Sequence, residues 1–414
     1  MRNPFSSSVI GLMLLATTVV PSLVMGVFET SSMAAGTLII SALSLLLFVM
    51  FKGHFFASKR LCVGAFAIIF SAAVVFAHSA FSYLGSDDFD FERFWQSYLL
   101  LIIYIAGAFS FAELMRKLTG YQVDVAVKFV FYSLLLSGLA GIFKYSPFFK
   151  EITAKSVFFY IEPSHFALSF LPFLLYMVVR SESRTKFLLI FTSLLMAFLL
   201  ENLTLLVGIA LISFVAVPFR RLALILPFAA LLLGAFDIDY YLSRLDFSAD
   251  NTNLSALVFI QGWERSYLNF LESSGRGVGF QQFGIVGNLG AILENIEVLA
   301  GAMLNIFDGG SVAPKFIGEF GLLGLLIILS YVVYCVKGIK KLHKLSVNMA
   351  TPDDCKSIFF SSCFVMYSID LFVRGTGYFS SSGFLFIASL MWIALTKSSN
   401  YFRFNMPVAT WSGP

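Results

Sequence analysis

Long apolar runs recur from one end of this 414-residue sequence to the other, and they constrain its fold more than any motif does. A helix needs about 20 apolar residues to cross a bilayer, and a spanning segment satisfies its backbone polar groups internally. Hydrophobic residues make up 58% of the chain and charged residues 13%, which is about half the charged share of a soluble protein. The sequence therefore predicts an all-α integral membrane protein with a single polytopic domain over residues 1–414.

Twelve segments are predicted to span the membrane, near 9–28, 34–51, 61–78, 97–112, 124–143, 163–180, 184–201, 203–219, 222–236, 316–336, 357–373 and 379–396. The segments 184–201 and 203–219 belong to one apolar stretch, which as a single helix would be about 46 Å long and would exceed the ~30 Å hydrocarbon core. We therefore expect a helical hairpin that turns at 201-ENLT-204, although no Gly or Pro marks the turn. The first segment is similar to a signal peptide, but no A-x-A-like cleavage site follows it closely, and we expect an uncleaved helix.

The distribution of Lys and Arg predicts the orientation of these spans. With the N-terminus in the cytoplasm, the cytoplasmic connections and both tails hold 18 of the 28 Lys and Arg residues. The short connections on the opposite side hold five, and the acidic stretch 86-SDDFDFE-92 lies on that side too. We therefore predict that both termini are cytoplasmic. The basic cytoplasmic connections are 52–60, 113–122, 180–186, 220–221 and 337–344.

Residues 237–315 form a connection that is much longer than the others, and the predicted orientation places it on the outer side of the membrane. It contains apolar pieces such as 289-LGAILENIEVLAGAMLNIF-307. A connection of this length is usually functional or disordered. Because its apolar pieces favour burial, we predict a large structured loop that caps the outer face.

The stretch 162-EPSH-165 places ionisable residues next to very apolar sequence. Pro163 fits the first position of a helix, where its missing N–H costs nothing. Glu162 would then be the N-cap, and His165 would lie on the same helix face at the outer edge of the membrane, where the helix dipole favours anions. Two interpretations remain open: Glu162 caps the helix while His165 packs beneath it, or both belong to a functional site, as ionisable groups at membrane depth often do.

The long loop contains the glycine-rich segment 275-GRGVGF-280. This segment is not a dinucleotide-binding fingerprint, because no soluble strand–helix–strand unit surrounds it. We instead expect Gly277 and Gly279 to permit a tight turn close to a ligand or to another stretch of backbone.

Arginine side chains in the outer segments are candidates for binding phosphate groups, because guanidinium groups bind phosphate oxygens bidentately and stay charged. Arg244, Arg265 and Arg276 share the long loop, and the alternative for each is a solvated loop surface. Arg374 follows a predicted span in 370-DLFVRGTGY-378, where a structural pair with Asp370 is the alternative.

Three segments resemble the Wzy-type O-antigen polymerases, within the broader group of O-antigen polymerases and ligases. They are 161-IEPSHFAL-168, the segment from Trp263 through 274-SGRGVGFQQF-283, and 314-PKFIGEFGLLGL-325. The order of these segments and the late, long outer loop are similar to the family across most of the chain. Two departures are visible: many relatives carry an Arg a few residues before the position of Trp263, and relatives often carry Ser-Arg where this sequence has 201-ENLT-204.

The resemblance implies a GT-C-like fold with about 12 transmembrane helices in the bacterial inner (cytoplasmic) membrane. It also implies that a glycan on undecaprenyl diphosphate moves, on the periplasmic side, to the hydroxyl of another undecaprenyl-diphosphate-linked repeat unit. The expected partners are this lipid-linked oligosaccharide, membrane lipids and a chain-length regulator protein, whereas nucleic acid is not expected.

Such a polymerase needs a base for the acceptor proton and positive charge where the diphosphate leaves. Glu162 and His165 are the catalytic candidates for the base. Burial would strengthen Glu162 as a base, whereas nearby arginines would weaken it. The residues predicted to bind the diphosphate or substrate are Arg244, Arg265, Arg276, Arg374, Gly277 and Gly279.

No metal or other cofactor is expected, because the resemblance points to metal-independent transfer. The D-x-D patterns at 88-DFD-90 and 237-DID-239 arise often by chance in acidic loops. Two alternatives remain open: an O-antigen ligase that joins the polymer to lipid A-core, and a lipid-linked oligosaccharide flippase or other transporter. A transporter would place charged residues deep in its spans, whereas the ionisable residues here gather at the predicted outer edge.

Overall fold

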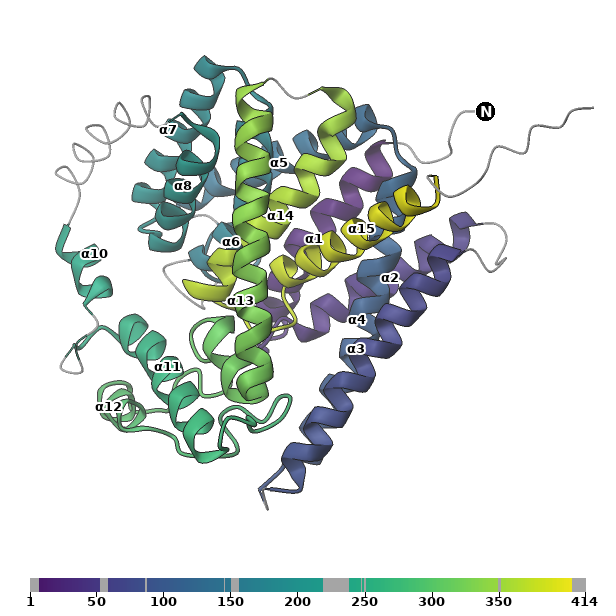
Figure 1. Cartoon of the computed structure of the whole chain (residues 1–414). Coiled ribbons are helices and arrows are strands. Elements are labelled where there is room, and N and C mark those ends of the chain that lie inside the picture. Colours follow the sequence, from purple (N-terminus) through teal and green to yellow (C-terminus); the bar gives the residue numbers. More distant parts are fainter. Residues whose placement is uncertain are drawn as a thin grey trace, which may run out of the picture.

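The computed structural model describes residues 7–52, 59–85, 88–144, 146–149, 156–218, 238–246, 248, 251–348 and 351–403. Across these residues the protein is all-α, and 8 of its helices are long and apolar enough to cross a membrane (Figure 1). These helices are α1 Ser7–Val27, α2 Ala34–Lys52, α3 Lys59–Tyr83, α4 Phe91–Lys117, α5 Gly120–Ile142, α6 Pro163–Arg180, α13 Val312–Val347 and α14 Cys355–Phe372. The chain is therefore a multi-pass helical membrane protein.

Three further helices coincide with predicted spans: α7 Ser183–Leu199, α8 Leu203–Ala216 and α15 Ser381–Arg403. The predicted hairpin is confirmed, because α7 ends and α8 begins on either side of Glu201, whose φ is 50°. Asn202 caps α8 by accepting a hydrogen bond of 3.0 Å from the Leu205 N–H. The predicted span 222–236 lies outside the described residues.

The bundle has two ends with different chemistry. Basic side chains at one end, here called the basic end, donate to backbone carbonyls of distant segments: Arg180 donates to the Thr351 carbonyl at 2.9 Å, and Lys186 donates to the Ser346 carbonyl at 2.7 Å. The opposite end, here called the loop end, carries the long loop. The Lys356 Nζ donates to the Arg116 carbonyl at 2.9 Å, so the predicted cytoplasmic connection 113–122 also lies near the basic end. That this end faces the cytoplasm stays a prediction.

Helix α6 occupies the centre of the bundle and packs against α5, α7, α8, α13 and α14. Every side chain from His165 to Val179 is buried. A helix that is apolar on all sides is stable only when other helices surround it. The start of α6 therefore lies in the middle of the loop end.

The described part of the long loop contains the helices α10 Ile238–Leu245, α11 Leu254–Glu272 and α12 Ala291–Ala300, joined by non-helical segments (Figure 1). Leu257, Val258 and Ile296 form a small hydrophobic core between α11 and α12. Helix α11 also packs against α13. That this loop caps the outer face of the membrane stays a prediction.

Helix α13 consists of two helical pieces joined at Gly321, which has φ 57° and ψ −132°. The glycine-rich segment lies against this kink: the Gly279 N–H donates to the Glu319 carbonyl at 2.9 Å, and the Leu322 N–H donates to the Gly275 carbonyl at 2.8 Å. A Cβ atom at Gly277 would lie 2.4 Å from the Glu319 carbonyl oxygen. The sequence suggested that these glycines allow close approach either of a ligand or of another stretch of backbone. The geometry matches the second explanation.

Candidate functional site

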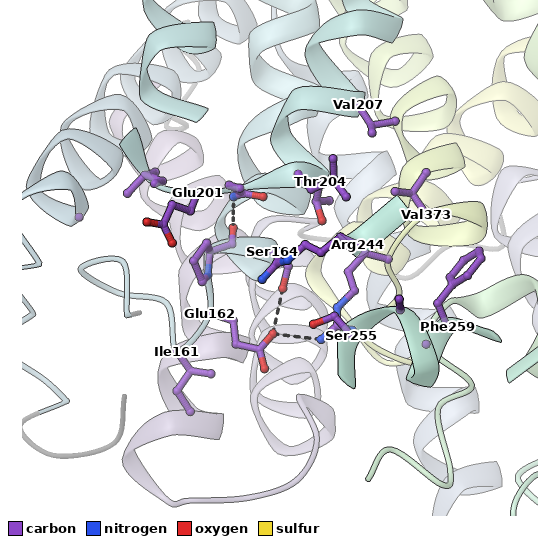
Figure 2. Close-up of a pocket in the computed structure, with 18 of the residues that line it drawn as sticks. Ile161, Glu162, Ser164, Glu201, Thr204, Val207, Arg244, Ser255, Phe259 and Val373 are labelled. Atoms are coloured by element: carbon purple, nitrogen blue, oxygen red, sulfur yellow. Dashed lines mark hydrogen bonds and ion pairs between the residues drawn. The ribbon is translucent and has the colours of Figure 1, made fainter. Parts of the chain in front are cut away.

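A cavity of ≈ 630 Å³ lies at the loop end beside the start of α6 (Figure 2). Helices α6, α8, α10 and α11 contribute to its wall, together with the turn after α14. Its apolar lining includes Leu203, Val207, Phe259, Phe372 and Val373. Its charged lining consists of Lys144, Glu162, Glu201, Arg244 and Arg374. The cavity lining thus combines apolar side chains with charged side chains of both signs.

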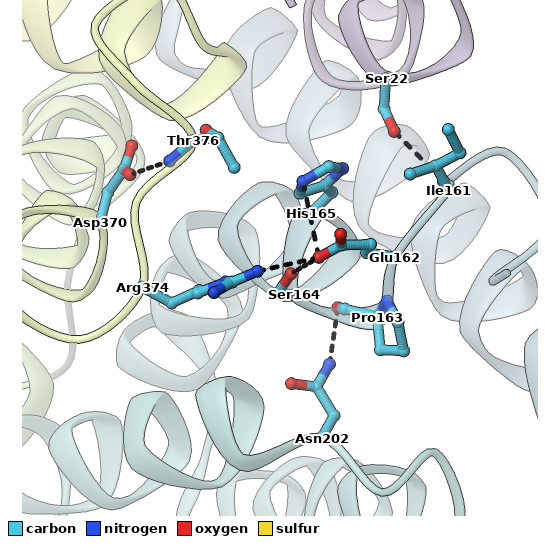
Figure 3. Close-up of polar contacts among 10 residues, drawn as sticks. All are labelled: Ser22, Ile161, Glu162, Pro163, Ser164, His165, Asn202, Asp370, Arg374 and Thr376. Atoms are coloured by element: carbon cyan, nitrogen blue, oxygen red, sulfur yellow. Dashed lines mark hydrogen bonds and ion pairs between the residues drawn. The ribbon is translucent and has the colours of Figure 1, made fainter. Parts of the chain in front are cut away.

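The antiparallel packing of α6 and α14 brings Glu162 and Arg374 together. Helix α6 begins at the loop end, whereas α14 ends there, so the residue before α6 lies beside the turn after α14. The Arg374 Nη2 is 3.2 Å from the Glu162 Oε2, although the two residues are 212 positions apart in the sequence (Figure 3). The predicted base candidate and one predicted phosphate-binding arginine therefore form an ion pair.

Glu162 occupies the N-cap position of α6, but its side chain makes no capping hydrogen bond. Its Oε2 instead accepts a bond of 3.0 Å from the Ser164 hydroxyl, in addition to the contact with Arg374. Burial alone raises the pKa of Glu162, but His165, Arg374 and the Ser164 hydroxyl favour the carboxylate and lower the pKa to about 2. Of the two opposing effects that the sequence suggested, stabilisation by positive charge prevails. Glu162 is ionised, and it is a weak base while Arg374 is in contact with it.

His165 is 6% exposed and faces a second, smaller cavity of ≈ 50 Å³. Its Nε2 is 3.9 Å from the Glu162 Oε2, which is too long for a hydrogen bond. Its Nδ1 has no hydrogen-bond partner among the described residues. Glu162 and Arg374 line both cavities, whereas His165 lines the smaller cavity and is not part of the larger one's lining.

The hairpin between α7 and α8 also contributes to the site, which the family resemblance did not suggest. Glu201 and Asn202 line the larger cavity. The Asn202 Nδ2 donates a hydrogen bond of 2.6 Å to the Pro163 carbonyl, and this bond ties the turn to the start of α6. A non-glycine residue with positive φ, such as Glu201, is uncommon and tends to mark a functional or tightly held position.

Arg265 holds the long loop together. Its side chain is 0% exposed and donates to the carbonyls of Ile306 at 2.6 Å and Leu289 at 3.3 Å. Burial lowers the pKa of Arg265 to about 10, although Glu264 acts in the opposite direction, and the guanidinium therefore stays charged at neutral pH. Arg265 is not among the residues that line either cavity.

The remaining predicted binding residues divide into two groups. Arg244 on α10 lines the larger cavity together with Glu162 and Arg374. Arg276, by contrast, is exposed, and its Nε donates to the Ser273 carbonyl at 2.9 Å. Gly277 and Gly279, which lie against α13, are likewise outside the lining of both cavities.

Asp370 does not pair with Arg374, contrary to the interpretation that the sequence allowed. Its carboxylate accepts hydrogen bonds from the Thr376 N–H at 3.2 Å, from the Ser380 hydroxyl at 3.2 Å and from the Ser382 hydroxyl. Because the side chain is 0% exposed, these donors are what stabilises it. Asp370 therefore fixes the turn that carries Arg374.

A buried polar network near the site was not predicted. The Lys315 Nζ lies 3.4 Å from the Asp308 Oδ1, and the Tyr378 hydroxyl donates to the Glu319 Oε2 at 2.8 Å. Asp308 lines the smaller cavity together with His165. A signal for this network is present in 314-PKFIGEF-320, where Lys315 and Glu319 lie one turn apart at the start of an apolar helix.

The described residues contain no group of three or more His, Cys, Asp and Glu side chains that could hold a metal ion. In 88-DFD-90, Asp90 is instead the N-cap of α4 and accepts a bond of 3.0 Å from the Arg93 N–H. The chain matches no protein-family model, and no curated protein matches it significantly.

Proposed function

We propose that the protein is an O-antigen polymerase of the bacterial inner membrane. In this proposal it belongs to the GT-C-like glycosyltransferases with about 12 spans, and its loop end faces the periplasm. The enzyme transfers a glycan from undecaprenyl diphosphate to a hydroxyl of another undecaprenyl-diphosphate-linked repeat unit. The observation that carries the proposal is the Glu162–Arg374 pair, whose charged atoms lie 3.2 Å apart in a cavity that apolar side chains also line.

The charged groups of the cavity fit the two requirements of this transfer. The departing diphosphate needs positive charge, and Arg374 and Arg244 both line the cavity. The acceptor hydroxyl needs a base, and Glu162 lies in the same cavity. Diphosphate is already a good leaving group, so the reaction needs no counterpart to the general acid of a glycosidase.

The apolar side chains that line the cavity fit a lipid-linked substrate. Leu203 and Val207 on α8 line the cavity, and Phe372 at the end of α14 also contributes. A polyprenyl chain needs such an apolar surface next to the site that binds its diphosphate. A soluble sugar nucleotide has no comparable apolar tail, and the proposal therefore favours a lipid-linked donor.

The test is polymerisation by the purified protein in lipid nanodiscs, with undecaprenyl-diphosphate-linked repeat units from its own host, with and without EDTA. We expect a ladder of lipid-linked products that persists in EDTA. Arg374→Ala should abolish the ladder, whereas Arg276→Ala should retain it, because Arg276 is an exposed arginine outside both cavities.

Two other results would redirect the assignment. Transfer that occurs only after lipid A-core is supplied would replace the polymerase by an O-antigen ligase. The absence of transfer to either acceptor would overturn the glycosyltransferase proposal, and flipping of the lipid-linked oligosaccharide between bilayer leaflets would then be measured.

A further inference from the structure

In this structure, Glu162 and Arg374 form an ion pair with each other. In the proposed reaction, however, each of the two side chains has to interact with the substrate. Arg374 has to neutralise the diphosphate, and Glu162 has to accept a proton. The contact of 3.2 Å between the Arg374 Nη2 and the Glu162 Oε2 is the one ion pair of Arg374 among the described residues. Binding of a diphosphate to Arg374 therefore competes directly with Glu162.

We propose that the diphosphate displaces Glu162 from Arg374, and that this exchange of partners converts Glu162 from an ion-pair acceptor into the base of the transfer reaction. The transfer step rests on the proposed function. The exchange itself requires only that a diphosphate binds in the larger cavity, and it can therefore be tested without any sugar transfer.

The position of Arg374 allows this exchange. Arg374 lies in the turn after α14, and its side chain is 25% exposed and lines both cavities. Asp370 fixes the backbone of this turn through Thr376, Ser380 and Ser382, so that the guanidinium can move while the turn stays in place. A bidentate guanidinium–phosphate contact provides two charge-assisted hydrogen bonds, which compensate for the lost contact with the carboxylate.

Glu162 remains positioned after Arg374 has moved. The Ser164 hydroxyl, which is on the first turn of the same helix, still donates to the Glu162 Oε2 at 3.0 Å. The half-buried carboxylate loses a positive neighbour and gains a negative one, and both changes increase its affinity for a proton. The other ionisable groups that line the two cavities are Lys144, His165, Glu201, Arg244 and Asp308.

The transfer step then balances. The acceptor O–H bond breaks and its proton goes to the Glu162 carboxylate, while the acceptor oxygen forms a bond to the anomeric carbon of the donor sugar. The bond between this carbon and the diphosphate oxygen breaks, and its electron pair leaves on the diphosphate. Arg374 and Arg244 line the cavity where this charge develops. Without a donor, Glu162 stays paired with Arg374, which disfavours activation of water by the empty site.

The exchange predicts that removal of the competing carboxylate of Glu162 strengthens the binding of the diphosphate rather than weakening it. We would measure the affinity of the protein in nanodiscs for undecaprenyl diphosphate that carries no glycan. Glu162→Gln should bind it about tenfold more tightly, equivalent to about 1.4 kcal/mol. Glu162→Gln combined with Arg374→Gln should lose this gain. Soluble pyrophosphate should compete with the lipid if the diphosphate group provides the recognition.

Glu201→Gln is the matched control, because Glu201 is an exposed carboxylate that lines the same cavity. An equal gain in Glu201→Gln would show a general effect of negative charge and would overturn the exchange, as would unchanged or weaker binding by Glu162→Gln. Misfolding of a variant would weaken its binding of undecaprenyl diphosphate, so it does not account for tighter binding. A ladder of products without this gain would overturn the exchange alone, whereas the gain without any transfer would overturn the proposed function alone.

Discussion

Replacement of Arg265 by alanine should damage the long loop rather than the diphosphate site. The Arg265 guanidinium is fully buried and donates to the carbonyls of Ile306 at 2.6 Å and Leu289 at 3.3 Å. These bonds join α11 to the segments on either side of α12. Arg265→Ala leaves both carbonyls without the charged donor and leaves an unfilled volume in the loop.

The magnitude follows from the two bonds. A hydrogen bond to a charged group contributes about 1.5–3 kcal/mol, and a buried group left unsatisfied costs about 1–3 kcal/mol. For two carbonyls, we expect the free energy of local unfolding of the loop to fall by about 2–6 kcal/mol. Arg276→Ala is the control, because Arg276 is exposed and its Nε donates to a nearby carbonyl, that of Ser273 at 2.9 Å.

Hydrogen exchange measures this effect directly, because amide protection reports local opening. In Arg265→Ala, the amides of α11 and α12 should exchange at least about 30-fold faster, which corresponds to the lower bound of about 2 kcal/mol, while those of α6 keep their protection. Arg276→Ala should leave both sets unchanged. If Arg265→Ala kept the protection of α11 and α12 but lost binding of undecaprenyl diphosphate, the structural assignment would be wrong and Arg265 would act at the diphosphate.

Three further predictions concern the surroundings of the ion pair. Asp370→Asn should loosen the turn that carries Arg374 and lower kcat/KM for the lipid-linked donor by about 10- to 100-fold, measured as initial rates of transfer. Gly277→Ala should destabilise the protein by about 2 kcal/mol or more, seen as a lower Tm, because φ is +84° and the new Cβ would lie 2.4 Å from the Glu319 carbonyl oxygen. The folded-state pKa of Glu162 is about 2, below its ordinary value of 4.5, so its ionised form stabilises the protein above pH 4.5 and this contribution is lost as the pH falls towards 2. The difference in Tm between the wild type and Glu162→Gln should therefore be constant from pH 8 to 5 and shrink below pH 4.5, and a difference that grows on acidification would contradict this sign.

Helix positions were predictable because the bilayer imposes a simple rule on the sequence. A spanning segment satisfies its own backbone and is apolar over about 20 residues, so each run marks a helix without knowledge of its neighbours. The same rule predicted the hairpin between α7 and α8, because a single helix over this apolar stretch would be longer than the hydrocarbon core is thick. The residues that make the turn were less obvious, because Glu201 adopts a positive φ and Asn202 provides the cap where a glycine or proline would be a clearer signal.

The roles of the arginines were harder to predict, because a role depends on burial and partners that the local sequence does not contain. Arg265 and Arg374 both lie in predicted outer segments beside glycines or aromatic residues. One is fully buried against carbonyls of its own loop, whereas the other reaches a carboxylate 212 positions away. The glycines near Gly277 were equally hard to interpret. The sequence indicates that a ligand or another stretch of backbone approaches them closely, but it does not identify the neighbour as α13.

The meeting of Glu162 and Arg374 nevertheless has a signal in the sequence. Among the eight long apolar helices, α6 and the η1–α14 segment Pro352–Phe372 have the lowest hydropathy and the largest buried share. A helix that faces lipid needs an apolar surface, whereas a helix surrounded by other helices tolerates Ser, His, Tyr and Cys at its contacts. The two least apolar spans are therefore the ones expected to pack together at the centre. Since α6 begins and α14 ends on the same predicted side, their contact places the residue before α6 beside the turn after α14, and it is this packing that joins the carboxylate to the guanidinium.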